Sequence, residues 1–179
     1  NLGLDISNSL NGVIQFSGGA QTIRLGVSTV ADSTPDGIVM GNRSTTLGGA
    51  IVIGADSSMT LPGRGTGAVI VGQSCESLGS YSVNVGYNTQ AGENSLALGR
   101  NSSATSVRSV AIGYNSLSSG LEAISLGYGS EAQAQQCIAI GKNSKANQND
   151  AISIGGDSQA IANQSLSIGF ESRANFNNA

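Results

Sequence analysis

The chain has 179 residues, with 26 glycines, no tryptophan, no histidine and only 4% aromatic residues, so a compact core of large side chains is excluded. Charged residues make up 11% and the net charge is −3, which excludes charge-driven disorder and gives no electrostatic basis for binding nucleic acid or an anionic membrane. No apolar run approaches about 18 residues, so no membrane-spanning segment is predicted. Chains of this composition are typically ordered by repetition. The chain begins at Asn1 without a signal-like stretch, and we expect it to be a piece of a longer protein.

The first 36 residues have a rhythm of their own. Three alternating stretches, LDI (Leu4–Ile6), IQF (Ile14–Phe16) and IRL (Ile23–Leu25), predict short strands. The stretch TVADSTPDG (Thr29–Gly37) is rich in turn-forming residues and predicts a junction loop. We therefore expect a β-rich N-terminal segment at residues 1–36 and a repetitive domain at residues 37–179.

From residue 37 onward the sequence repeats, and a glycine marks each repeat. Most of these glycines are fourteen residues apart, as Gly141, Gly155 and Gly169 are, and ten of them stay in register. The residues one and three positions before each glycine are always aliphatic or Met, and residues two apart share one face of a β-strand. The pairs are Ile38/Met40, Ile51/Ile53, Val69/Val71, Val83/Val85, Leu96/Leu98, Val110/Ile112, Ile124/Leu126, Ile138/Ile140, Ile152/Ile154 and Leu166/Ile168.

The other face of this predicted strand is mostly small and carries no charge. Four residues before the glycine the side chain is always small, and two residues before it the column changes from Val39 and Ile70, through Asn84, to Ala or Ser. Because neither face is charged, the strand is predicted to be buried on both sides. After the glycine, an Asn-type turn leads to a second short strand, in which Ser144 and Ala146 exemplify the inward positions and polar residues point outward.

Each repeat therefore predicts one coil of strand, turn, strand and turn, and about ten coils would stack in parallel at about 4.8 Å per step. Two assignments of the inward face are open. In the favoured one, Val and Ile fill the roll against Ser and Ala of the second strand, and another copy covers the small-residue face. In the other, the small residues lie inside and the aliphatic residues form the contact between copies. Either way we expect a closed symmetric oligomer, with core or interface packing by Ile112, Ile140, Ile154, Ile168, Ala111 and Ala139.

The repeats also resemble a known family. The stretch SVAIGYNSLSSG (Ser109–Gly120), with its relatives CIAIGKNSKANQ and SLALGRNSSATS, is similar to the YadA-like head repeats of trimeric autotransporter adhesins, and the resemblance covers about residues 37–174. It implies a left-handed parallel β-roll, three chains around one axis, and a place at the tip of a surface fibre. Such repeats also occur in phage tail fibres. Residues 1–36 depart from the pattern, and the sequence stops at FNNA without the neck and stalk usual in the family, so adhesin and phage fibre both stay open.

The residue types argue against an enzyme. Histidine is absent, and the carboxylates are scattered singly, so no catalytic pair and no metal site is predicted. The calcium-binding nonapeptide repeat is missing, and fourteen is not a multiple of the hexapeptide of acyltransferase helices. No cofactor is expected. Cys75 and Cys137 lie several coils apart, at positions that hold small residues in other repeats, so we expect two unpaired, buried thiols. Unpaired thiols are slightly more typical of a protein that folds in a reducing cytoplasm than of an exported one.

Two features are candidate ligand contacts. The position after the glycine holds Tyr87, Tyr114, Tyr128 and Phe170, and exposed aromatic residues are favoured in contacts. The alternative is that these rings pack between subunits or cover the edge of a coil. A longer repeat carries an insertion within MTLPGRGTGA (Met59–Ala68), with Arg64 expected at its tip, and the alternative here is an insertion without a role.

The sequence thus predicts a non-enzymatic, homotrimeric head domain of an extracellular fibre, on a bacterial surface or a virion. It would attach to a cell-surface receptor, glycan or matrix protein, and three copies of each site would raise avidity. The alternative is a structural spacer whose binding tip lies elsewhere. An ice-binding face is less favoured, because the outward positions mix Glu, Gln, Lys, Arg and Leu. No partner nucleic acid and no membrane insertion are expected.

Overall fold

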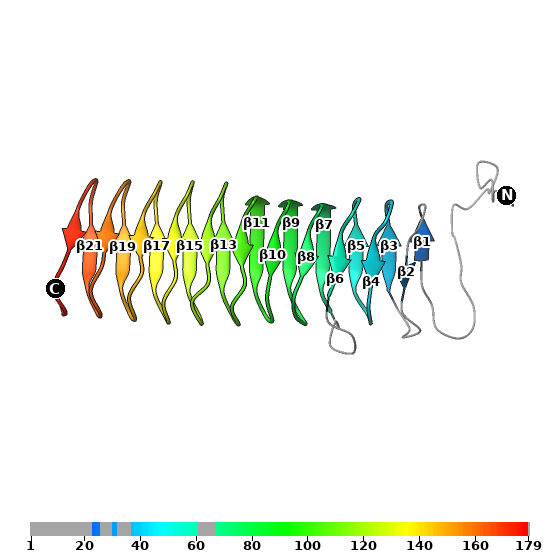
Figure 1. Cartoon of the computed structure of the whole chain (residues 1–179), viewed down its shortest axis with the longest axis horizontal. Helices are drawn as coiled ribbons and strands as arrows, with labels where there is room; N and C mark the ends of the chain where they lie inside the picture. Colours follow the sequence, from blue (N-terminus) through cyan, green and yellow to red (C-terminus); the bar gives the residue numbers. More distant parts are fainter. Residues whose placement is uncertain (1–22, 26–29, 32–36, 61–66, 179) are drawn as a thin grey trace, which may run out of the picture.

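The structure is a computed structural model that describes residues 23–25, 30–31, 37–60 and 67–178. Within these ranges the chain forms strands and turns, and no helix there is long and apolar enough to cross a membrane. The coils stack one after another into a rod, with β1 near one end and β21 at the other (Figure 1). The predicted all-β parallel solenoid is confirmed.

Each coil from β5 onward contributes one strand to each of two long sheets. Among the described residues, the first sheet has eleven strands and the second has nine, while β2 and β4 form a two-stranded pair. The first sheet contains β1 (Ile23–Leu25), β3 (Ile38–Met40), β5 (Ile51–Ile53), β7 (Val69–Gln73), β9 (Val83–Tyr87), β11 (Leu96–Arg100), β13 (Val110–Ile112), β15 (Ile124–Leu126), β17 (Ile138–Ile140), β19 (Ile152–Ile154) and β21 (Leu166–Ile168). The second contains β6 (Ser58–Met59), β8 (Glu76–Ser77), β10 (Gln90–Ala91), β12 (Ser103–Ala104), β14 (Leu117–Ser118), β16 (Glu131–Ala132), β18 (Lys145–Ala146), β20 (Gln159–Ala160) and β22 (Arg173–Ala174), and the pair is β2 (Val30–Ala31) with β4 (Thr45–Thr46).

The register places equivalent residues of successive coils side by side. In β17 and β19, for example, Ile138 pairs with Ile152 and Ile140 with Ile154. The backbone amide of Ile138 donates to the carbonyl of Ala151 at 2.9 Å. In this parallel register the backbone N–H and C=O groups of each coil form hydrogen bonds with the coils before and after it. The repeated sequence therefore produces a continuous ladder of backbone hydrogen bonds.

The N-terminal strands extend the same ladder. The predicted strand IRL is β1, which pairs in parallel with β3, whereas the predicted strands LDI and IQF lie outside the described residues. The expectation of a junction loop over 29–37 is wrong at Val30–Ala31, because these residues form β2 and pair with Thr45–Thr46. The boundary proposed at residue 36 falls among residues that are not described, and it stays a prediction.

The inward face of the first strands is the small one, so the favoured assignment of the sequence is wrong. In β13 and β17 the buried residues are Ala111 and Ala139, while Ile112 and Ile140 point out of the roll and are only half-buried. The second strands face inward with Ser and Ala, as predicted. From β11 onward, small residues of the first sheet therefore meet small residues of the second inside the roll.

Serine pairs show how thin this core is. Hydroxyl oxygens approach across the roll at 2.6 Å for Ser125 and Ser130 and at 2.7 Å for Ser153 and Ser158. Only side chains of one or two heavy atoms fit between backbones at that separation. Among the described coils, those nearest the N-terminus have larger core residues, because Val39, Val52, Met59 and Ile70 are buried there.

Candidate interaction surfaces

The outward side of the first sheet is an apolar surface that the described part of the chain leaves half-buried or exposed. We call the outward aliphatic pairs of β3 to β21, which are the residues one and three positions before each repeated glycine, the aliphatic face, and none of these residues is charged. Leu98 and Leu126 are about two-fifths exposed, and Ile168 is 62% exposed. Large continuous apolar surfaces on soluble proteins are usually contact sites. The predicted packing residues thus divide, with Ala111 and Ala139 inside the roll and Ile112, Ile140, Ile154 and Ile168 on the aliphatic face.

The second sheet presents a different outer surface. Its outward positions hold residues such as Glu76, Gln90 and Gln159, and Lys145 pairs with Glu131 at 2.8 Å. Polar and charged side chains of this kind are stable in water. The two outer surfaces of the rod therefore differ in chemistry, and the aliphatic face is the one that favours a protein contact.

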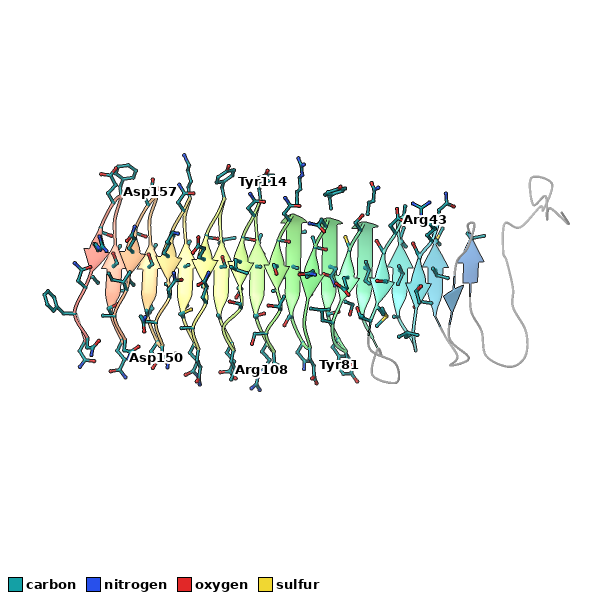
Figure 2. The ribbon with its side chains drawn as sticks, viewed as in Figure 1. Arg43, Tyr81, Arg108, Tyr114, Asp150 and Asp157 are labelled. Carbon is teal, nitrogen blue, oxygen red and sulfur yellow. The ribbon has the colours of Figure 1, made fainter. Side chains whose placement is uncertain are left out.

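A stack of planar groups lines one edge of the rod, and we call Tyr87, Arg100, Tyr114 and Tyr128 the aromatic corner. The guanidinium carbon of Arg100 lies 5.6 Å from the ring centroid of Tyr87 and 5.7 Å from that of Tyr114. The rings of Tyr114 and Tyr128 are stacked, with centroids 5.2 Å apart and planes 13° from parallel. These spacings are close to the step between coils, so the repeat itself places the groups within the range of ring stacking and cation–π interaction. Tyr114 projects from the edge of the rod in Figure 2.

The other predicted contact residues are not part of this stack. Phe170 is 73% exposed and lies two coils beyond Lys142, with Gly156 between them in the column. Arg64 lies outside the described residues. Sequence reasoning missed Arg100, although its place in the same column as the tyrosines was the signal that could have identified it.

Side-chain amides form a second ladder beside the aromatic corner. Asn88 donates from Nδ2 to Oδ1 of Asn101 at 3.2 Å, and Asn101 donates to Asn115 at 3.0 Å. All three residues have left-handed backbone, with φ of 54° to 56°, which Asn tolerates better than most residues. The predicted Asn-type turn is thus confirmed at these coils. The ladder fixes the corner backbone that carries the stacked side chains.

Arg100 is expected to stabilise the rod more than a matched arginine does. Each exposed cation–π contact contributes roughly 0.5–1 kcal/mol, and Arg100 makes two, so Arg100→Gln should lower the free energy of unfolding by about 1–2 kcal/mol per chain. The control is Arg108→Gln on the opposite edge (Figure 2), where Arg108 pairs with Glu122 at 2.7 Å and the expected loss is below about 1 kcal/mol. Urea unfolding followed by circular dichroism measures both. Equal losses would contradict the stacking contribution.

Both thiols are buried in the core. Cys75 and Cys137 are free, with at most 1% exposure, and burial raises the pKa of the Cys137 thiol. Since the thiolate is the reactive form, native protein should react with iodoacetamide at least about a hundredfold more slowly than an exposed thiol. An added thiol in the exposed variant Ser119→Cys gives that reference rate. Fast labelling of either native thiol would contradict this packing. Within the described ranges, no three His, Cys, Asp or Glu side chains come together as a metal site.

Comparison with known proteins identifies the repeats. The family model described as YadA head domain repeat (2 copies) matches residues 91–116, 118–144 and 138–158. The crystal structure of the collagen-binding domain of the Yersinia adhesin YadA is 28% identical, with 76% of this chain and 71% of that chain covered and a TM-score of 0.49. No curated protein matches the chain. The chain therefore contains YadA-like head repeats, stacked as an all-β parallel solenoid.

Proposed function

We propose that the chain is a non-enzymatic adhesin head, which assembles as a homotrimer and attaches to a cell surface or extracellular matrix. The single observation that carries this proposal is the uncharged aliphatic face along a rod built from YadA-like head repeats. Such a head would act outside the cell, on a bacterial surface or on a virion. The family repeats support adhesion, and the aliphatic face supports assembly.

The aliphatic face is the proposed contact between chains. The second sheet lies against the inward side of the first, and among the described residues no further sheet or helix lies over the aliphatic face. Three copies that turn this face toward one axis would bury it completely and leave the polar second sheet in water. A closed ring also avoids an open-ended filament, which a head-to-tail contact would risk.

The aromatic corner is the proposed ligand contact. Its tyrosines are 38–54% exposed, and stacking reduces the mobility that binding would otherwise have to remove. Phenol hydroxyls and the Arg100 guanidinium are hydrogen-bond donors, which suits partners rich in acceptor oxygens, such as glycans and the main chain of matrix proteins. Three copies per trimer would convert weak single contacts into useful avidity. Arg64 and Phe170 remain proposed accessory contacts.

A binding screen tests this proposal. The assembled protein is passed over immobilised collagen, other matrix proteins and an array of neutral and sulfated glycans. Tyr114→Ala should weaken any binding at least about tenfold, as loss of a central aromatic contact does. The matched control is Tyr81→Ala, because Tyr81 is 61% exposed on the opposite edge (Figure 2). Equal effects of the two variants would exclude the aromatic corner as the contact, and no binding at high trimer concentration would favour the structural spacer.

A further inference from the structure

A cluster of buried polar atoms without partners lies inside the rod, where coil 83–91 meets the next coil. Asn84 is fully buried, and neither Nδ2 nor Oδ1 of its amide has a hydrogen-bond partner. The hydroxyls of Thr89 and Ser102 are also fully buried and also lack a partner. We call Asn84, Thr89 and Ser102 the Asn84 cluster. Buried polar groups are nearly always hydrogen-bonded, so four such atoms together require an explanation.

The repeat brings these three side chains together. Asn84 and Thr89 occupy the positions that Ser125 and Ser130 occupy in a later coil, where the two hydroxyls lie 2.6 Å apart across the core. Ser102 holds the position of Thr89 one coil further on, and the amide of Gln90 donates to the carbonyl of Ser102 at 3.1 Å. The side chains of the cluster therefore face one small region of the core.

The surrounding core changes size at the same place. On one side of Asn84 the inward column holds Ile70, and on the other side Ala97 pairs with Asn84. In this inward column the buried residues before Asn84 are Val39, Val52 and Ile70, and the next two after it are Ala97 and Ala111. The inward side chains of this column thus become smaller next to Asn84, and the cluster itself is polar.

We propose that the Asn84 cluster holds one buried water molecule, which links the amide of Asn84 to the hydroxyls of Thr89 and Ser102. Water is a neutral molecule with two donors and two acceptors, and buried waters typically make about three hydrogen bonds to groups of this kind. A metal ion does not fit, because the cluster contains no carboxylate, thiolate or imidazole. The water would occupy the boundary between the large-residue core and the alanine core.

Crystallography of the assembled protein, at a resolution that shows ordered water, tests the site directly. The expected result is a density peak within hydrogen-bond distance of the Asn84 amide and of both hydroxyls. A direct hydrogen bond from Asn84 to Thr89 or Ser102, with no such peak, would overturn the proposal.

A double-mutant cycle gives a second readout in solution. If one water bridges two coils, Asn84→Ala and Ser102→Ala should be coupled, so the urea midpoint of the double variant should shift by less than the sum of the single shifts, by on the order of a third. The matched control pair is Ser125→Ala with Ser144→Ala, which occupy equivalent positions, although Ser125 already bonds directly to Ser130. Here the shifts should add. Additive shifts in the Asn84 cluster would count against the water.

Discussion

Gly155→Ala is expected to destabilise the rod severely, whereas the same substitution at the next residue is expected to be mild. Gly155 has φ of 134°, a conformation that L-residues rarely adopt. A Cβ there would collide with the carbonyl oxygen of Gly169 in the next coil and would lie 2.7 Å from its carbonyl carbon. Strain and overlap together should lower the free energy of unfolding by about 3–5 kcal/mol, and thermal unfolding followed by circular dichroism measures the loss.

The neighbouring Gly156 provides the control. A Cβ there would lie 3.3 Å from the ring of Phe170, and this exposed ring can move aside at little cost. Gly156→Ala should therefore change the free energy of unfolding by less than about 1 kcal/mol. If both substitutions lowered the free energy of unfolding by similar amounts, the close approach of Gly155 to the next coil would not be the reason that glycine is needed there.

Leu126→Lys is expected to prevent assembly. Leu126 lies on the aliphatic face and is 40% exposed in the single chain. In the proposed trimer each copy would bury a lysine charge without a partner near the symmetry axis, at a cost above about 3 kcal/mol per chain. Analytical ultracentrifugation should show the particle falling from three chains to one.

The same substitution on the other sheet is the matched control. Leu117 points outward from β14 and lies beside Glu131 in the register, so Leu117→Lys places its charge in water near a carboxylate. The assembly should be unchanged. A wild-type protein that sediments as a single chain would contradict the trimer. Dissociation by Leu117→Lys would mean that the chains meet through the second sheet and not through the aliphatic face of the first.

The alternation of the sequence was sufficient to predict the strands and the parallel register, because repeated glycines fix where each coil ends. It was not sufficient to decide which face points inward. Residues such as Ile140 and Ala139 alternate equally well under either assignment, and the usual preference for burying the larger side chain favoured the wrong one. In the structure the inward residues of β13 to β21 are Ala or Ser, which meet Ser or Ala of the second sheet, and this packing decides the assignment.

The side-chain arrangement at the two edges of the rod could also be predicted only in part from the sequence. The column of Tyr87, Tyr114 and Tyr128 was visible in the sequence, but stacking depends on the rotation of each side chain and on the step between coils. Arg100 joins the stack because a planar cation fills the one coil where a ring is missing. On the opposite edge, left-handed backbone at Arg108 and Glu122 carried no sequence signal, since neither residue type favours that conformation.

The uniform register of the two sheets determines which insertions and deletions the rod can tolerate during evolution. From β11 onward each coil meets its neighbours through the same main-chain bonds and small inward side chains, so one of these interior coils can substitute for another. An in-frame gain or loss of a whole repeat in the gene would lengthen or shorten the rod by one step and leave its cross-section intact. A gain or loss of part of a repeat would shift the inward columns outward, and selection should remove it unless it bulges out between strands.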